Sequence, residues 1–157
     1  MSWDVAYTVM LVVHSYLRWL VLLAGLVVVA RSVRGWLGAR AFVPVDNRAQ
    51  VAFMSLLDLQ MLVGLVLYAG LSPVTTAFFA DPKAGMKDAA VRFFGVEHLV
   101  IMLVGVVLVH VGRVLGKKRR SDLARHKLTA ATTIVWLVLT LGAIPWPGMA
   151  AGRPLLR

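Results

Sequence analysis

Several side chains that could bind a metal or move a proton stand inside apolar runs that are otherwise nearly free of charge. His14 lies in the first run with Arg18 four residues later, and His98 lies in a later run. Residues four apart on a helix share a face, so His14 and Arg18 would lie one turn from each other. Ionisable groups inside a membrane are costly and are kept where they face a bundle interior, a cofactor or an ionic partner.

His14 and His98 lie at matching depth in the helices that carry them. A helix rises about 1.5 Å per residue, which puts His14 roughly 10 Å and His98 roughly 9 Å below the outer helix ends. Two imidazoles at one depth on diagonal helices can hold a haem iron, and such ligation favours electron transfer over oxygen binding. We therefore predict both as metal ligands. The alternative is two unrelated buried histidines. Zinc is less favoured, because Glu97 is the only nearby carboxylate.

A flat macrocycle also needs small residues beside it and cations near its propionates. Gly105 is predicted to contact the cofactor, and Arg92 is predicted to bind propionate, with Lys83 or Lys87. Glycines that only pack helices against one another are the alternative, since these are common in membranes. Ordinary interfacial charge is the alternative for Arg92. The glycines that supply one small residue to each predicted helix are Gly25, Gly64, Gly105 and Gly142.

Arg18 and Asp58 both fall near the predicted bilayer centre. An ion pair between them is the least costly way to keep two charges there. Gln60 lies at similar depth, on a different face from Asp58. The three form a predicted buried polar group that either fixes helix packing or contacts a proton or quinone beside the cofactor.

His110 and His126 make up a second, less regular set of histidines. His110 is roughly 18 Å along the helix from His98 and points about 120° away from it. His126 stands between Arg125 and Lys127, at the predicted membrane surface. One interpretation is a second haem site. The other is that His126 is a solvated loop histidine or contacts lipid phosphate.

Four apolar runs must position these residues. They cover about 7–30, 49–71, 92–115 and 128–144. The chain is 60% hydrophobic with a mean hydropathy of +0.81, above the roughly 45–50% apolar content of soluble domains. About 20 apolar residues span a bilayer. We predict an all-α integral membrane protein, residues 1–157 forming one up-down four-helix transmembrane bundle. The first residues lack a basic signal-peptide region, so the first run should remain as a helix.

The basic residues set the predicted orientation. The formal charge is +10, and there is no cysteine, which excludes disulfides and thiolate metal sites. Eleven basic residues fall in the two loops assigned to the inner side and five on the outer side. Cytoplasmic loops carry the excess of Lys and Arg, so both termini are predicted outside. This pattern disfavours nucleic-acid binding. The inner set is Arg31, Arg34, Arg40, Arg48, Arg113, Lys117, Lys118, Arg119, Arg120, Arg125 and Lys127.

Several short motifs, taken together, resemble a small family of bacterial four-helix membrane proteins labelled cytochrome b. The architecture is also similar to that of cytochrome b561-type proteins. The resemblance implies a b-type haem and a bacterial inner-membrane location, and it marks His14, His98 and His126 while leaving His110 open. The motifs are His14-Ser15-Tyr16-Leu17-Arg18-Trp19, Asp58-Leu59-Gln60, Gly64-Leu65-Val66-Leu67-Tyr68, Met86-Lys87-Asp88, Arg92-Phe93-Phe94-Gly95-Val96-Glu97-His98, Arg125-His126-Lys127 and Ala143-Ile144-Pro145-Trp146-Pro147.

The expected function is electron transfer by one haem b, or two, exchanging electrons with quinone or an outer-side redox protein. No catalytic residue is predicted, and the chain would act as an electron-transfer or quinone-linked oxidoreductase component. One alternative is a non-catalytic accessory subunit of a larger respiratory or photosynthetic membrane complex, or a homo-oligomer. Another is a quinone- or proton-binding module without haem, built on Arg18, Asp58 and Gln60.

Overall fold

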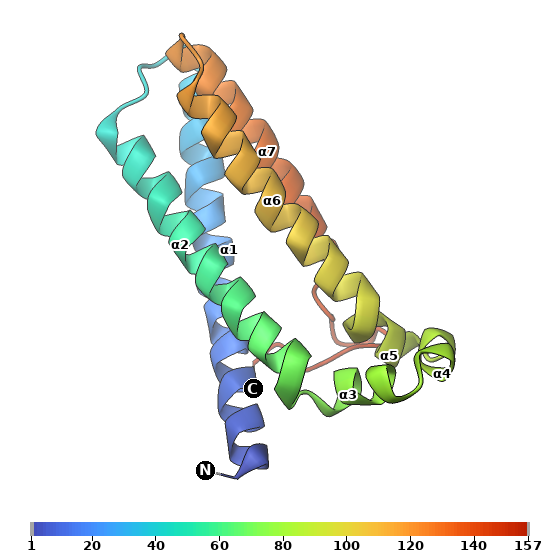
Figure 1. The fold of residues 1–157 in the computed structure, drawn as a ribbon. Helices are drawn as coiled ribbons and strands as arrows, with labels where there is room; N and C mark the ends of the chain where they lie inside the picture. Colours follow the sequence, from blue (N-terminus) through green and yellow to red (C-terminus); the bar gives the residue numbers. More distant parts are fainter. Residues whose placement is uncertain (1, 157) are drawn as a thin grey trace.

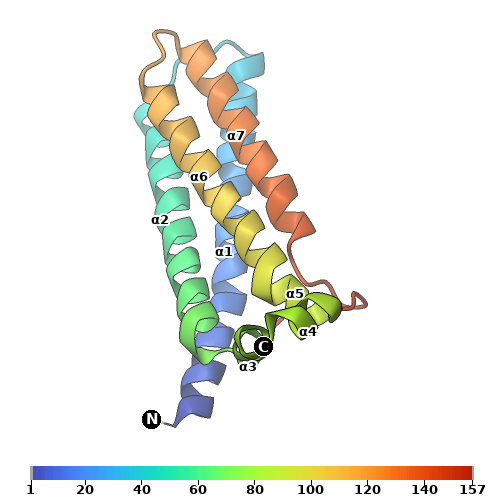
Figure 2. The ribbon, with the colours of Figure 1, turned by 45° about the vertical axis from the view of Figure 1, so that its right-hand side comes forward.

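Four long helices lie side by side and make up most of the molecule. The structure is a computed structural model that describes residues 2–156, and these residues form helices, turns and loops without a strand. The views in Figures 1 and 2 agree that the long helices run alongside one another. They are α1 Trp3–Leu37, α2 Pro44–Val66, α6 His98–Lys117 and α7 Asp122–Gly142.

Three short helices connect α2 to α6 across one end of the molecule. They are α3 Pro73–Ala80, α4 Pro82–Lys87 and α5 Ala89–Arg92. Each starts at a side-chain cap, because Ser72, Asp81 and Asp88 accept hydrogen bonds from the first turns. Two π-helical turns, Leu67–Leu71 and Phe93–Glu97, join these short helices to the long ones.

Three helices are long and apolar enough to cross a membrane, namely Trp3–Leu37, Pro44–Leu71 and Ala89–Lys117. The predicted all-α membrane protein is confirmed to this extent. The fourth predicted run, now α7, does not reach the same apolar content, because its first turns contain Arg125, His126 and Lys127.

The first long helix extends further at both ends than the apolar run predicted. It begins at Trp3, where Ser2 caps the helix by accepting from the Val5 amide at 3.4 Å. It continues through Arg31 and Arg34, because charge marks the edge of an apolar run without breaking a helix. The helix ends at Leu37 with Gly38 as its C-cap, and Ala39 has a positive φ of 46°.

The two ends of the molecule differ, and we name them for use below. The terminal end contains both chain termini and α3 to α5, and the loop end contains the 38–43 and 118–121 connections (Figure 1). α1 packs closely against α2 and α7, and α6 against α7, whereas among neighbouring long helices α2 and α6 contact each other least.

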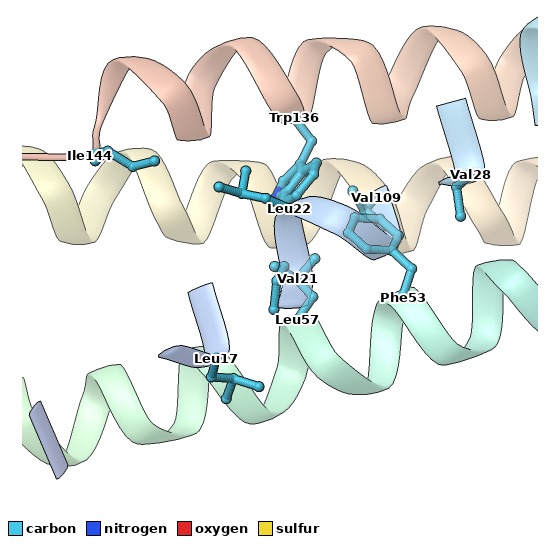
Figure 3. Close-up of a cluster of buried hydrophobic side chains, with 9 residues drawn as sticks. All are labelled: Leu17, Val21, Leu22, Val28, Phe53, Leu57, Val109, Trp136 and Ile144. Carbon is cyan, nitrogen blue, oxygen red and sulfur yellow. The ribbon is translucent and has the colours of Figure 1, made fainter. Parts of the chain in front are cut away.

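A cluster of large apolar side chains fills the middle of the bundle (Figure 3). Trp136 of α7 and Phe53 of α2 are each only 1% exposed, and their rings meet edge to face with centroids 4.6 Å apart. Gly25 of α1 and Gly105 of α6 face the Trp136 ring, and neither has room for a side chain there. The indole therefore occupies the central layer, and the terminal and loop ends lie on either side of it.

Candidate functional site

An apolar cavity lies at the terminal end, with the Trp136 ring in its wall. Residues of α1, α2, α6 and α7, together with the segment after α7, line it. Polar groups interrupt this wall, and four of them, His14, Arg18, Gln60 and His98, are positions singled out by the sequence. The other polar residues of the lining include Ser15, Tyr68, Ser72, Thr75, Thr140 and Arg153.

The structure brings His14 and His98 together across this cavity. Their ring centroids are 6.4 Å apart, and the ring planes are inclined by 66°. A metal ion takes an imidazole nitrogen at about 2.0 Å, and the ring centroid lies roughly 1 Å beyond it, so imidazoles on opposite sides of one ion have centroids roughly 6 Å apart. The separation of the two rings suits two axial ligands of one ion.

His98 is held in a defined tautomer by the backbone. It begins α6 directly after the π-helical turn Phe93–Glu97, and π turns are frequent at functional sites. Its Nδ1 lies 2.9 Å from the carbonyl oxygen of Ala143, which can only accept, so Nδ1 carries the proton. Nε2 is then the unprotonated nitrogen. Metal-binding histidines are commonly oriented by such a bond from the other ring nitrogen.

His14 is held by Gln60 of α2. The Gln60 side-chain nitrogen donates to the His14 carbonyl at 3.1 Å and lies 3.2 Å from His14 Nε2. Because that amide nitrogen is a donor, Nε2 is the unprotonated nitrogen of this ring as well. The ring lies against Gly64, where an added Cβ would come within 3.1 Å of it.

Two buried polar atoms at this site have no hydrogen-bond partner within residues 2–156. They are Nδ1 of His14 and Oε1 of Gln60. Buried polar atoms are nearly always paired, so an unpaired set at a cavity indicates a missing ligand or water. Here both atoms belong to the two side chains that interlock at the cavity wall.

Arg18 and Arg153 supply the positive charge of the cavity. The chain after α7 turns back toward α1, where the Leu155 carbonyl accepts from Ser15, Arg18 and Trp19 at 3.4, 2.5 and 3.3 Å. The Arg153 guanidinium lies over the Phe94 ring at 5.1 Å. The segment that follows α7 is therefore part of the site.

Two residues predicted to contact the cofactor do not line the cavity. Arg92 donates to Glu97 at 2.7 Å and to the Met86 carbonyl at 3.2 Å, so the neighbouring π turn and α4 hold it. Gly105 faces Trp136, and an added Cβ would lie 3.0 Å from its ring. The cofactor-binding roles of Arg92 and Gly105 therefore stay predictions. Arg153 is an arginine that does line the cavity.

The structure contradicts the predicted ion pair between Arg18 and Asp58. Asp58 lies 3.4 Å from Nε2 of His110, on the side of α2 that faces α6. Arg18 contacts the Leu155 carbonyl. The sequence places Arg18 and Asp58 at similar depth, but the Asp58 side chain points from α2 toward α6 and not toward α1. Gln60, two residues later on α2, is the polar residue that contacts His14 of α1.

His110 and His126 have separate partners, so the predicted second pair is wrong. His110 lies between Asp58 and the Val106 carbonyl, 3.0 Å from the latter. His126 lies at the loop end and is only 1% exposed, not solvated. Phe42 covers it, with ring centroids 4.9 Å apart.

Sequence reasoning missed the contributions of Tyr68 and Arg153. Tyr68 donates to the Gly95 carbonyl at 2.8 Å, and Thr75 donates to the Tyr68 carbonyl at 2.9 Å, so the two π turns are linked across the cavity. The position of Tyr68 was noted only as interfacial. No sequence signal indicated that Arg153 returns to the bundle.

Comparison with protein-family models, with curated proteins and with solved structures found no match to this chain. Across residues 2–156, no three or more His, Cys, Asp or Glu side chains gather as a metal cluster. The chemistry available at the cavity is therefore that of two facing imidazoles, an amide and two guanidinium groups in an apolar wall.

Proposed function

We propose that this chain is a membrane-embedded b-type haem protein that takes part in electron transfer, and that His14 and His98 would hold the haem iron. The observation that carries the proposal is the pair of imidazoles facing each other at 6.4 Å across the cavity. Nε2 of His98 is left unprotonated and without a donor, because Nδ1 bonds the Ala143 carbonyl, whereas Nε2 of His14 accepts from Gln60, whose amide would have to give up this bond to the iron. Haem, when bound, supplies a one-electron centre whose potential the surroundings tune.

The other residues of the cavity have roles that follow from their chemistry. Arg18 and Arg153 would face the haem carboxylates, since guanidinium groups pair well with carboxylates. The apolar wall would keep water from the iron. Haem is larger than the cavity of about 180 Å³, so binding requires α2 and α6, which contact each other least among neighbouring long helices, to separate at the terminal end.

The proposal includes a four-helix bundle in a bacterial cytoplasmic membrane, with both termini on the outer side. The loop end carries the larger share of basic residues, as expected for a cytoplasmic face. The terminal end, with the cavity, would then face the outer side. Electrons would be exchanged there with quinone or an outer-side redox protein.

The test is the optical spectrum of the full chain purified from haem-replete cells, with haem quantified as pyridine haemochrome against protein mass. One haem per chain is expected, and it should be lost in His14→Ala and in His98→Ala. His110→Ala is the matched control, because His110 lies outside the cavity, and it should keep the spectrum. A colourless wild-type protein, or equal loss in the control, would contradict the proposal.

A quinone site without haem is the second candidate, and the size of the cavity favours it. Its volume of about 180 Å³ is close to the roughly 150 Å³ cavity that holds one benzene ring. A quinone carbonyl could accept from Arg18 or from the Nδ1 proton of His14. Binding of a short-chain ubiquinone to haem-free protein, abolished in His14→Ala and kept in His110→Ala, would establish this candidate in place of the first.

A further inference from the structure

The loop end contains a buried histidine that the haem proposal does not use. The His126 side chain is 1% exposed, and its Nε2 lies 3.4 Å from the Ala41 carbonyl. Its Nδ1 is buried and has no hydrogen-bond partner among residues 2–156. The ring lies directly on the backbone of Gly35, where no Cβ could be accommodated. A glycine at this point of α1 is what allows an imidazole to be placed there.

Three arginines line the same hollow as His126. Arg31 donates to Asp46 at 2.8 Å, and Asp46 also accepts from the Val43 amide at 2.9 Å, so that carboxylate is fully engaged. Arg34 and Arg40 line the hollow and make no ion pair within the described residues. We call Arg31, Arg34, Arg40 and His126 the arginine hollow. The arginine hollow contains three guanidinium groups and one carboxylate, so its net charge is positive.

The segment that carries Arg40 is held in place by local contacts. Ala39 adopts a left-handed conformation with φ of 46°, and the Arg40 amide donates to the Gly35 carbonyl at 3.0 Å. Phe42 packs on His126, and the Arg125 guanidinium lies over the Phe42 ring at 3.6 Å. A loop fixed in this way presents its arginine without a further ordering cost on binding.

We propose that the arginine hollow binds a phosphate group. Guanidinium forks match the oxygen geometry of phosphate, and the unpartnered imidazole nitrogen adds a donor when it carries the proton. The hollow opens where α1 passes from apolar residues to Arg31 and Arg34. Two sources share this chemistry: the headgroup of an anionic phospholipid, or a free phosphate compound. The inference does not depend on haem or quinone at the terminal end.

The experiment uses the full chain, purified in a neutral detergent, and follows its thermal unfolding midpoint. Phosphatidylglycerol is titrated in mixed micelles against phosphatidylcholine, and inorganic phosphate is titrated against chloride at equal ionic strength. A ligand that binds only the folded state raises the midpoint with concentration. A rise with phosphatidylglycerol alone assigns the site to a lipid headgroup. A rise with inorganic phosphate also assigns it to a free phosphate compound, and both results support the proposal.

The variants test whether binding depends on the arginines of the hollow or on any positive charge at this end of the molecule. Arg34→Gln combined with Arg40→Gln should weaken apparent binding by at least about tenfold, because each arginine supplies charge-assisted hydrogen bonds. Lys117→Gln combined with Arg120→Gln is the matched control, since these exposed cations at the same end do not line the hollow. The control pair should bind like wild type.

The proposal is overturned if neither ligand raises the midpoint of wild type, or if the control pair loses as much binding as the hollow pair. Arg34→Lys combined with Arg40→Lys keeps the charge and removes the guanidinium forks, so it should give an intermediate loss. Haem content measured on the same samples should be unchanged in every variant. This keeps a failure at the hollow distinct from a failure at the cavity.

Discussion

The polar network around Gln50 near the loop end and the polar groups of the cavity at the terminal end are satisfied to different extents. At the loop end, Arg113 donates to Gln50 at 2.9 Å and to Asn47 at 3.1 Å, and Gln50 donates to Thr129 at 2.7 Å. This network ties α2, α6 and α7 together. At the terminal end, the polar atoms of His14 and Gln60 line a cavity, and some of them have no protein partner. In the Gln50 network the side chains complete one another's hydrogen bonds, whereas the unpaired atoms at the cavity could bond a ligand.

The comparison shows that intramembrane polarity alone does not identify a functional residue. Gln50 and Gln60 lie on the same helix, less than three turns apart, and their residue type alone does not separate them. Gln50 is buried in a complete network, whereas Gln60 is held beside a histidine with one oxygen unused. The unfulfilled hydrogen bond, and not the residue type, marks the site.

The largest expected effect on stability comes from the layer that separates the two ends. Trp136→Ala should destabilise the fold by about 3–5 kcal/mol, because it leaves a large hole against Gly25 and Phe53. Chemical unfolding in detergent micelles measures it. Tyr68→Phe, which removes one hydroxyl at the terminal end, serves as a control and should cost far less. A loss from Trp136→Ala below 1 kcal/mol would mean that the two ends are not divided by a packed layer.

Breaking the loop-end network should have the next largest effect. Gln50→Leu leaves the Thr129 hydroxyl and one Arg113 nitrogen without their partners, and each unsatisfied buried group costs about 1–3 kcal/mol. The free energy of unfolding should fall accordingly, while haem content stays at the wild-type level. If Gln50→Leu removed haem without loss of stability, the division of roles between the two ends would be reversed.

Gln60→Leu is the matching change at the terminal end. Its loss of stability should be smaller than that of Gln50→Leu, because Oε1 of Gln60 already lacks a partner. The expected result is reduced affinity for haem, or for quinone under the second candidate, since Gln60 orients the His14 ring. Titration of haem into haem-free protein measures it, and Gln60→Asn tests whether another donating amide restores binding. Wild-type affinity in Gln60→Leu would remove Gln60 from the site.

The smallest effect is expected at the pair that replaced the predicted Arg18–Asp58 bridge. Asp58 is 52% exposed and His110 is 39% exposed, so the protein encloses this contact only partly, and a typical hydrogen bond contributes on the order of 1 kcal/mol. Asp58→Asn should therefore change the free energy of unfolding by less than about 1 kcal/mol in detergent, with haem content unchanged. A loss as large as that of Gln50→Leu would show that this pair acts as a buried element after all.

Helix type, helix positions and membrane character follow from the sequence by itself. Long apolar runs with charge confined to their ends are enough to predict helices, and the rise per residue places His14 and His98 at one depth. The sequence could not supply the direction in which each side chain points once helices pack. That direction depends on crossing angles and on the π turn at Phe93–Glu97, which changes the helical register just before His98.

Only the tertiary structure decided which polar residues meet. It turned Asp58 toward His110, placed Gln60 against His14, and brought Arg153 back to the cavity from a segment with no helical pattern. It also buried His126, which the basic residues around it had suggested was solvated. The physical reason is that hydrophobicity and helical rise are properties of one chain segment, whereas partners are set by contacts between segments distant in sequence.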